Sequence, residues 1–291
     1  MTSPQQAHVL AGLIGSGIGS SHSPLLHQRE ADRQGIRLLY TIIDSDAYGL
    51  TADDLPGLLR WAGKLGYRGL NVTYPFKQQI VRHLDQLSAE ARTLGAVNTV
   101  VFADGATCGY NTDAVGFARN FDRNFPAAPR DQVVQLGAGG AGSAVAHAML
   151  TLGAGHLTLV DVDTAKAHRL AALLAGEFSD DRIAVGAHAD LTGLLAGADG
   201  VINTTPIGMA HHPGSPVAPG DLRKDMWVAD IVYRPADTAL LQAARAAGAP
   251  TLPGAGMSVY QAVAAFEHFT GVPADAATML ADSEELLRSG R

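Results

Sequence analysis

Residues 132–142 decide the fold and read Gln-Val-Val-Gln-Leu-Gly-Ala-Gly-Gly-Ala-Gly. A short apolar run turns directly into Gly137, Gly139 and Gly142, which have the G-x-G-x-x-G spacing. Such glycines let a backbone pass close to a pyrophosphate and aim a helix N-terminus at it. Because residues 143–152 continue as an apolar helical segment, the stretch predicts a dinucleotide site. A purely structural strand-turn-helix is the alternative.

The sequence after the glycines continues the same pattern. A second predicted strand, residues 156–160, ends at Asp161, 24 residues after Gly137. This is near the spacing of a carboxylate that binds the ribose of a dinucleotide. Further strands are predicted at 183–185, 200–204 and 227–231. We therefore expect a Rossmann-like doubly wound parallel sheet, with α/β architecture, in a dinucleotide-binding domain over residues 114–257 that opens with a connecting helix at 114–121.

The first third of the chain alternates between strand-like and helix-like segments before the glycine turn begins. These segments are residues 8–14, 24–34, 36–43, 55–65, 69–72, 77–91 and 98–102. The alternation predicts a separate N-terminal α/β domain, residues 1–113, with mostly parallel strands and a role on the substrate side. Near the other end, Val259, Val263, Phe266 and Phe269 form a helical stripe. We expect C-terminal helices in residues 258–291 to pack back on the first domain.

Composition excludes several classes of protein. The 291 residues are 47% hydrophobic, which excludes disorder, and no run of about 18 apolar residues is available to cross a bilayer. The net charge of -7 argues against nucleic-acid and anionic-membrane partners. Cys108 is the single cysteine and should lie in a strand; the histidines lack metal-ligand spacing, so no metal is expected. The absence of a basic leader segment predicts a cytoplasmic protein.

Several motifs together resemble the shikimate/quinate dehydrogenase family over nearly the whole chain. In chain order they are Ser21-His-Ser23-Pro24, Asn71-Val-Thr73-Tyr-Pro75-Phe-Lys77, Ala96-Val-Asn98-Thr99, Gly109-Tyr-Asn111-Thr-Asp113, Gly137 to Gly142, Asn203-Thr-Thr-Pro-Ile-Gly-Met209, and Gly256-Met257 with Gln261. The resemblance implies reversible hydride transfer between a nicotinamide cofactor and the ring carbinol of shikimate or a close relative. It also implies that the two domains close to bring the ligands together.

Lys77 and Asp113 are the predicted catalytic pair. Lys77 stands where a strand is predicted to end and a helix over 77–91 to begin, and a cation at the positive end of a helix dipole is unusual enough to suggest function. A solvated lysine is the alternative. The resemblance implies that Lys77 is the general acid/base and that Asp113 is its partner. Asp113 also precedes a predicted helix, so it is equally typical of an N-cap.

The predicted substrate-binding residues carry short or uncharged polar side chains. The resemblance implies that Ser21 and Ser23 bind the ring carboxylate, although Ser23 before Pro24 is also typical of a helix cap. Members of the resembled family that favour quinate often have threonine at the second position, so the resemblance implies that Ser23 favours shikimate over quinate. The other residues implied to contact the substrate are Thr73, Asn98 and Gln261, with Tyr233 as a further contact or a packed aromatic.

The cofactor motif departs from the family's usual NADP pattern, Asn-Arg-Thr, because the sequence here is Asp161-Val162-Asp163. Two carboxylates would repel a 2'-phosphate, whereas Asp161 can bind both ribose hydroxyls of NAD. NAD is therefore favoured; Lys166 and Arg169 leave NADP as the alternative. The acids could also cap the next helix, which suits Asp163 better. The predicted cofactor-binding residues are Gly137, Ala138, Gly139, Gly140, Ala141, Gly142, Asp161, Thr204, Met209, Gly254 and Met257.

The leading hypothesis is an oxidoreductase that converts shikimate to 3-dehydroshikimate with NAD. Quinate and an amino-substituted shikimate are alternative substrates, and a methylene-tetrahydrofolate dehydrogenase is a more distant enzymatic alternative. A non-catalytic NAD-binding sensor is the alternative of a different class. The expected partner is a small polyhydroxy ring carboxylate, and the expected assembly is a monomer or homodimer.

Overall fold

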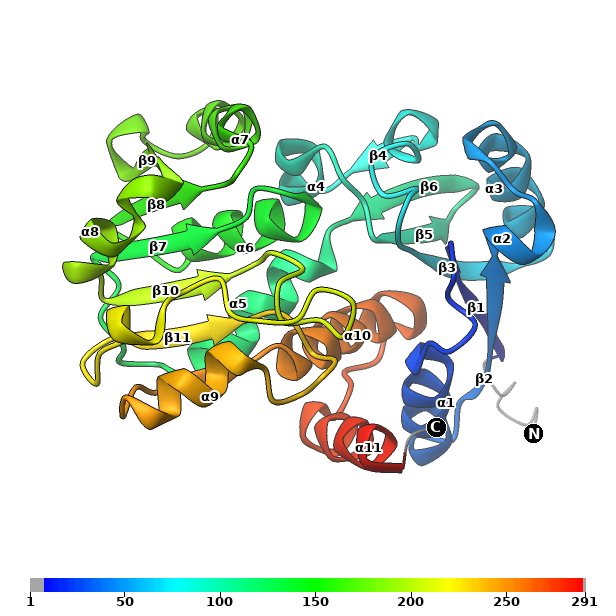
Figure 1. Ribbon diagram of the computed structural model, residues 1–291. Helices are drawn as coiled ribbons and strands as arrows, with labels where there is room; N and C mark the ends of the chain where they lie inside the picture. Colours follow the sequence, from blue (N-terminus) through cyan, green and yellow to red (C-terminus); the bar gives the residue numbers. More distant parts are fainter. Residues whose placement is uncertain (1–7, 290–291) are drawn as a thin grey trace. The chain divides into compact units, whose positions relative to one another are not determined.

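The computed structural model describes residues 8–289, so the domain ends predicted at residues 1 and 291 lie outside the described residues. The chain divides into two compact units (Figure 1). The first contains the residues up to Thr112 together with those from Val259 onward, and the second is Asp113–Ser258. Among the described residues, no helix has both the length and the hydropathy to cross a membrane.

The first unit is built on a six-stranded sheet in the order β2-β1-β3-β5-β6-β4. Its strands are β1 (His8–Gly15), β2 (Arg37–Asp44), β3 (Tyr67–Val72), β4 (Gln86–Leu87), β5 (Thr99–Ala103) and β6 (Ala106–Tyr110). β1 pairs in parallel with β2 and β3, but β5 runs antiparallel to both β3 and β6. The sheet is therefore more mixed than predicted. Asp104 and Gly105, both with positive φ, form the tight turn that closes the β5–β6 hairpin.

The prediction of a helix over residues 77–91 is wrong. This segment contains turns, a 3-10 helix (Val81–His83), β4 and α4 (Ala89–Leu94). The Asp85 carboxylate accepts hydrogen bonds from the Thr107 backbone N–H at 2.8 Å and its hydroxyl at 2.9 Å, and β4 pairs with β6. These bonds hold the chain extended beside β6 until Ser88 caps α4. Lys77 is consequently not at a helix start, and the dipole argument for it does not apply.

Helices cover both faces of the first sheet. They are α1 (Ser23–Arg33), α2 (Ser45–Tyr48), α3 (Leu55–Lys64), α10 (Ala255–Thr270) and α11 (Ala276–Ser289), with a 3-10 turn at Ala52–Asp54. One core, which includes Leu55 and Leu70, joins α3 to the sheet. A second core joins the opposite sheet face to α10 through Tyr40 and Phe269. Together these cores bury most of the sheet and leave its carboxyl edge to the loops.

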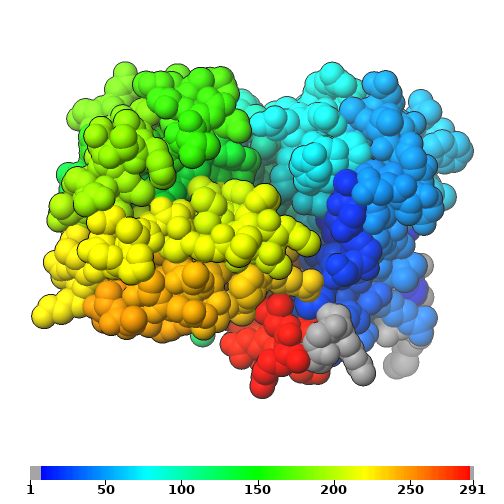
Figure 2. Space-filling view, viewed as in Figure 1, coloured from blue at the N-terminus to red at the C-terminus, as the bar shows by residue number. Residues whose placement is uncertain are grey.

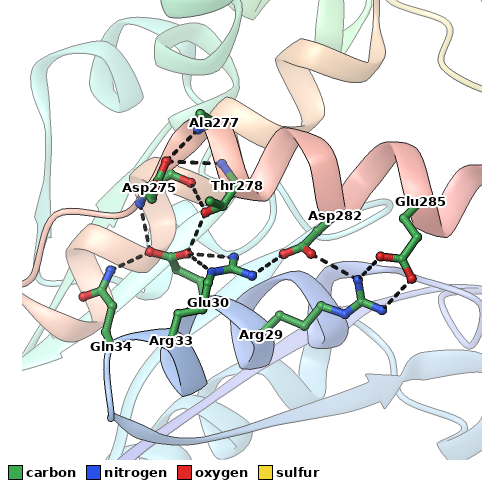
Figure 3. Close-up of polar contacts among 9 residues, drawn as sticks. All are labelled: Arg29, Glu30, Arg33, Gln34, Asp275, Ala277, Thr278, Asp282 and Glu285. Atoms are coloured by element: carbon green, nitrogen blue, oxygen red, sulfur yellow. Dashed lines mark hydrogen bonds and ion pairs between the residues drawn. The ribbon is translucent and has the colours of Figure 1, made fainter.

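Helix α11 is anchored on α1 by a cluster of polar contacts around the buried Glu30 (Figure 3). Glu30, only 1% exposed, accepts hydrogen bonds from the Arg33 guanidinium at 2.8 Å and the Asp275 backbone N–H at 2.8 Å. Arg29 reaches Asp282 and Glu285 on α11, each at 3.1 Å. Apolar contacts among α1, α10 and α11 lie beside this cluster. Helix α11 therefore packs as part of the first unit.

The second unit confirms the Rossmann-like prediction. All six strands are parallel, in the order β12-β11-β10-β7-β8-β9, with the order reversing between β7 and β10. The strands are β7 (Gln132–Leu136), β8 (His156–Val160), β9 (Ile183–Gly186), β10 (Gly200–Asn203), β11 (Trp227–Asp230) and β12 (Thr251–Pro253). The helices are α5 (Thr112–Asn124), α6 (Gly140–Thr151), α7 (Thr164–Ala175), α8 (Leu191–Ala196) and α9 (Ala239–Ala246), with 3-10 turns at Asp180–Arg182, His188–Asp190 and Pro219–Asp221. In such sheets ligands bind outside the carboxyl ends of the strands, at the reversal point.

Candidate functional site

Most of the predicted substrate residues meet at one edge of the first sheet. Ser21 and Ser23 follow β1, whereas Thr73 and Lys77 follow β3, and these two strands are parallel. Asn98 immediately precedes β5, which runs antiparallel to β3 and therefore begins at the same edge. The topology thus gathers five of the predicted residues from three separate stretches of sequence.

Asn98 lies at the centre of this edge and is 3% exposed. Its backbone carbonyl accepts from the Val72 N–H at 2.8 Å, and its backbone N–H donates to the Tyr110 carbonyl at 3.1 Å. The Asn98 side-chain carbonyl Oδ1 accepts from the Thr112 backbone N–H at 2.7 Å. Gln261 on α10 joins the same group, since the Thr112 hydroxyl lies 3.4 Å from Gln261 Oε1. Asn98 therefore links β3, β6 and the start of α5.

The two serines are joined to each other. The Ser21 hydroxyl donates to Ser23 Oγ at 3.1 Å, and the Ser23 backbone N–H donates to Ser21 Oγ at 3.2 Å. Ser23 is the first residue of α1; the N-cap is His22, whose side chain makes no capping hydrogen bond. The alternative that Ser23 is only a helix cap is therefore wrong. Two hydroxyls at the positive end of a helix suit a carboxylate.

Lys77 and Asp113 are both tethered near Asn98. The Lys77 carbonyl accepts from the Val97 backbone N–H at 2.8 Å, one residue before Asn98, and its side chain is half-buried. Asp113 directly follows Thr112, whose N–H binds Asn98. Because α5 begins at Thr112, Asp113 lies in the first helical turn and not at an N-cap. A carboxylate there is favoured by the helix dipole.

In the second unit, two glycines of the turn at residues 137–142 are required for steric reasons. Gly137 has φ +98°, and a Cβ on Gly142 would lie 2.4 Å from the Gly137 carbonyl oxygen. The buried Gln135 amide donates to the carbonyls of Gly137 at 2.9 Å and Gly142 at 2.8 Å. The Thr204 hydroxyl, from the end of β10, lies 2.9 Å from the Gly137 carbonyl. Gln135 and Thr204 thus brace the turn from behind.

The other two glycines of the turn leave room in front of it. A Cβ on Gly139 or Gly140 would meet nothing within 4 Å, so neither glycine is required by the protein's own packing. Gly139 is the N-cap of α6, whose start has no side-chain cap and no acidic residue in its first turn. Open space before uncapped N–H groups of a 12-residue helix fits a pyrophosphate. The residues present therefore fit a dinucleotide.

Asp161 connects the end of β8 to this turn. One carboxylate oxygen accepts from the Ala138 backbone N–H at 2.8 Å, and the other accepts from the Asp163 N–H at 2.8 Å. Asp163 caps α7 through the Ala165 N–H at 3.1 Å, as its position in the sequence suggested. Val162 between them is 86% exposed. The side chain that would replace the family's arginine therefore points into solvent.

The remaining predicted residues of the second unit have mixed surroundings. Gly254 is required by packing, because a Cβ there would lie 2.3 Å from the Ile231 carbonyl oxygen. Met257 is buried, whereas Met209 and Tyr233 are 41% and 47% exposed. Met209 lines an open cleft of about 490 Å³ that is also lined by Gly208, Arg234 and Pro235. In Figure 2 the segment that follows β10, coloured yellow, and helix α9, coloured orange, together form much of this unit's visible face.

Several polar residues at these edges were missed by the sequence interpretation. Asn71, Tyr40, Thr99 and Thr112 form the buried surroundings of Asn98. In the second unit, Asp230 is 1% exposed and accepts from Asn203 Nδ2 at 2.9 Å and the Thr238 hydroxyl. Burial raises the pKa of Asp230, opposed by these hydrogen bonds. The available signal was a polar residue inside an apolar strand, as at Asn71 and Gln135.

Three family models match successive parts of the chain. The shikimate dehydrogenase substrate binding domain matches residues 13–100, and the saccharopine dehydrogenase NADP binding domain matches residues 133–211. The shikimate 5'-dehydrogenase C-terminal domain matches residues 254–281. The order of these matches agrees with the two units described above: the unit with the Asn98-centred edge comes first in the sequence, and the unit with the glycine turn follows it.

Individual proteins match over almost the full length. The chain is 54% identical over 281 residues to a shikimate dehydrogenase (NADP(+)) of Streptomyces avermitilis, covering 97% of both chains. It is 45% identical to a quinate/shikimate dehydrogenase (NAD(+)) of Corynebacterium glutamicum, covering 93% of this chain and 96% of the relative. Among solved structures, the quinate dehydrogenase from Corynebacterium glutamicum in complex with NAD has a TM-score of 0.92 at 43% identity, covering 96% of this chain and 100% of that one. Shikimate 5-dehydrogenase from Listeria monocytogenes in complex with shikimate and NAD has a TM-score of 0.87 at 27% identity, covering 99% and 98%.

Proposed function

Because this chain belongs to the shikimate/quinate dehydrogenase family, we propose that it catalyses the reversible oxidation of shikimate to 3-dehydroshikimate with a nicotinamide dinucleotide. The observation that carries the proposal is the Asn98-centred edge. It gathers hydroxyl and amide side chains, beside one lysine, at the end of a sheet. Such a set can bind a polyol by hydrogen bonds without adding charge.

Lys77 is the proposed general acid/base. In the oxidation direction the carbinol O–H bond breaks and its proton passes to the neutral amine Nζ, while the C–H pair leaves as hydride and the carbonyl forms. A bound nicotinamide ring supplies the chemistry that accepts this hydride. Asp113 orients the hydroxyl toward Lys77. In the reverse direction the Lys77 ammonium returns the proton to the oxygen.

The ring carboxylate is assigned to Ser21 and Ser23. Their mutual hydrogen bond and their place at the start of α1, the positive end of the helix, support this assignment. On binding, the Ser21 O–H can turn from Ser23 Oγ to a carboxylate oxygen, so no new charge is needed. Thr73 and Gln261 are assigned to ring hydroxyls, and Tyr233 to a further contact.

NAD is the proposed preferred dinucleotide. The pyrophosphate is assigned to the open space before Gly139 and Gly140, and the adenosine ribose to Asp161. A 2'-phosphate would face the carboxylates of Asp161 and Asp163, with exposed Val162 providing no cation. Lys166 and Arg169 on α7 are the nearest cations in sequence. The named relatives include both NADP and NAD enzymes. We assign the choice between the two dinucleotides in this chain to residue 162.

Steady-state kinetics with four substrate and cofactor combinations test these proposals together. We expect the highest kcat/KM for shikimate with NAD. A higher kcat/KM with NADP than with NAD would reject the proposed cofactor preference. A higher kcat/KM for quinate than for shikimate would reject shikimate as the preferred substrate. Lys77→Ala should lower kcat by at least 100-fold; turnover within a few-fold of wild type would reject the role of Lys77. No turnover of either ring acid would favour the non-catalytic sensor.

Quinate is the second candidate substrate. The specific observation that favours it is the TM-score of 0.92 to a protein named quinate dehydrogenase, which was solved with NAD. Quinate has a saturated ring with an additional hydroxyl, so it requires one more polar contact than shikimate. A kcat/KM for quinate that exceeds the value for shikimate would select it.

A further inference from the structure

A continuous chain of buried hydrogen bonds runs behind the proposed substrate site in the first unit. The Tyr40 hydroxyl lies 2.7 Å from Asn71 Oδ1, and Asn71 Nδ2 lies 3.0 Å from the Thr99 hydroxyl. Thr99 Oγ1 is 3.1 Å from both Asn98 Oδ1 and the Thr112 hydroxyl. Tyr40, Asn71, Asn98 and Thr99 are each at most 6% exposed. The residues come from β2, β3 and the start of β5, so tertiary structure alone creates the chain.

Backbone groups at two points fix which way the side-chain amides face. The Thr112 backbone N–H can only donate, so the atom of Asn98 that it contacts at 2.7 Å must be the carbonyl oxygen. The Asn98 backbone carbonyl can only accept, so the Asn71 atom 3.4 Å from it must be the amide nitrogen. These two assignments settle the orientation of both amides, which a side-chain network alone would leave open.

The directions of the other bonds follow from these two amides. Tyr40 must donate to Asn71 Oδ1, because a carbonyl oxygen cannot donate. Burial raises the pKa of the Tyr40 phenol, opposed by the Ser23 hydroxyl, so the phenol keeps the proton that it donates. Thr99 must accept from Asn71 Nδ2 and can pass its own proton to Asn98 Oδ1. The Thr112 hydroxyl also lies 3.1 Å from this oxygen, so Asn98 Oδ1 faces three donor groups of the protein and is not left for a ligand.

One polar group of Asn98 is left for a ligand. Within the part of the chain that the structure describes, nothing accepts a hydrogen bond from Asn98 Nδ2, and this atom is not among the fully buried polar atoms that lack a partner. The side chain therefore offers N–H donors and no acceptor. An amide held in this way recognises an acceptor oxygen, and a rigid orientation avoids the entropy cost of ordering it on binding.

We infer that Tyr40 and Thr99 are positioning residues that hold Asn98 with its Nδ2 donors toward an oxygen of the ring substrate, Tyr40 through Asn71 and Thr99 both directly and through Asn71. This inference rests on the proposed function and deepens it, since it assigns residues outside the substrate contacts to substrate recognition. Removal of the Tyr40 hydroxyl leaves Asn71 Oδ1 without its donor, and removal of the Thr99 hydroxyl leaves Asn71 Nδ2 with only the 3.4 Å contact to the Asn98 carbonyl. Asn98 and the ring acid are then held less rigidly.

Thr99→Val tests the inference, with Thr99→Ser as the conservative variant and Thr41→Val as the matched control. Thr41 is also a strand residue of this sheet, and its hydroxyl lies 3.0 Å from the Tyr67 hydroxyl. Neither residue belongs to the chain of hydrogen bonds between Tyr40 and Asn98. We expect Thr99→Val to raise KM for shikimate roughly tenfold or more and to leave KM for the dinucleotide unchanged. Thr99→Ser should restore most of the loss, and Thr41→Val should match wild type.

Tyr40→Phe, with Tyr67→Phe as its control, provides a second variant in case Thr99→Val fails to fold. We expect the same selective rise in KM for shikimate from Tyr40→Phe only. The inference is overturned if Thr99→Val and Tyr40→Phe both keep the wild-type KM for shikimate. It is also overturned if Thr41→Val and Tyr67→Phe raise this KM as much as Thr99→Val and Tyr40→Phe do, or if Thr99→Ser is as defective as Thr99→Val.

Calorimetric binding of shikimate separates this inference from the proposed function. Wild-type protein that binds shikimate without turning it over would overturn the proposed catalysis, and the same variants would then be compared by Kd, with the same roughly tenfold expectation. Wild-type protein that neither binds nor turns over a ring acid would overturn both. Normal wild-type kinetics with unchanged variants would overturn only the positioning role.

Discussion

The Asp161 carboxylate accepts a hydrogen bond from the backbone N–H of Ala138 at 2.8 Å, which ties the end of β8 to the glycine turn. Each carboxylate oxygen keeps a further lone pair, so this bond and a ribose contact are compatible. Asp161 therefore supports the turn in addition to its proposed role in the choice of dinucleotide. The choice is tested more cleanly at residue 162, which does not hold the turn.

Val162→Arg should shift the preference toward NADP. The Val162 side chain is 86% exposed, so an arginine can be accommodated without loss of packing. A guanidinium can pair with a 2'-phosphate and offset the neighbouring carboxylates. We expect kcat/KM with NADP to rise about tenfold, while the value with NAD changes by less than about threefold. Val272→Arg, at an exposed position in the first unit, is the control; an unchanged ratio in Val162→Arg would place the 2'-phosphate elsewhere.

Gly139→Ala and Gly142→Ala should have different effects. A Cβ at residue 139 meets nothing within 4 Å, so Gly139→Ala should keep wild-type stability but weaken dinucleotide binding at least tenfold by filling the cradle. A Cβ at residue 142 lies 2.4 Å from a backbone oxygen, so Gly142→Ala should lower the free energy of unfolding by about 2 kcal/mol. Thermal unfolding and calorimetric titration with NAD measure these effects. Normal NAD affinity in Gly139→Ala would mean that the pyrophosphate binds elsewhere.

The contrast between these glycines shows what the sequence could predict. The spacing of the glycines and the apolar strands around them was sufficient for the Rossmann-like sheet, because each signal is local. It could not distinguish glycines required by packing, such as Gly142, from those that leave space, such as Gly139. That distinction depends on how the turn places the Gly137 carbonyl against Gly142, and on Thr204, which reaches the turn from the end of β10.

The errors in the first unit have the same origin. The apolar spacing of Ile80, Leu84 and Leu87 suits a helix, but the hydrogen bonds between Asp85 and Thr107 draw this segment alongside β6. The Asp104-Gly105 turn was a local signal that the sequence interpretation did not use. The hydrogen bonds from Tyr40 through Asn71 to Thr99 could not be predicted from local sequence, because these three residues are distant in sequence and become neighbours only through the order of strands.

Stability should fall in acid because of His27. The ring is fully buried against Tyr40, Phe266 and Phe269, and neither ring nitrogen has a hydrogen-bond partner among the described residues. Burial lowers the pKa of His27 from 6.5 to about 3. The unfolded chain therefore binds a proton between these values that the folded chain does not. The contribution is complete above pH 6.5 and declines toward pH 3, by up to about 1.4 kcal/mol per pH unit.

His27→Phe should reduce this pH dependence. Phenylalanine keeps the ring contacts but binds no proton, so the difference in free energy of unfolding between pH 7 and pH 5 should shrink by about 2 kcal/mol. Urea denaturation at the two pH values measures it. His168→Phe, at an exposed position on α7, is the control and should leave the difference unchanged. An unaltered difference in His27→Phe would assign the acid sensitivity to other groups.

Glu30→Ala should loosen the C-terminal helix. It leaves the Asp275 N–H without its acceptor and the Arg33 guanidinium with Asp282 as its remaining carboxylate partner, at a site where Glu30 is 1% exposed (Figure 3). We expect a loss of about 2 kcal/mol in the free energy of unfolding and faster hydrogen exchange in α11. Glu284→Ala removes an exposed carboxylate from the same helix and should cost less than about 0.5 kcal/mol. Equal effects of the two substitutions would contradict an anchoring role for Glu30.

Asn98→Asp should separate the two faces of the Asn98 side chain. Aspartate keeps an oxygen for the Thr112 N–H at 2.7 Å, so the start of α5 should stay in place. It replaces the outward N–H donors by an acceptor, which faces a substrate oxygen unfavourably. We expect kcat/KM for shikimate to fall at least 100-fold, while the calorimetric Kd for NAD stays within about twofold of wild type. Asn124→Asp, in α5 outside the proposed site, is the control and should change neither quantity.

A pH series with Asn98→Asp distinguishes the lost donor from the added charge. Protonation of the new carboxyl at low pH restores an O–H donor and should recover part of the activity relative to wild type. If Asn98→Asp bound shikimate as tightly as wild type at every pH, the outward group of Asn98 would not be a donor to the substrate.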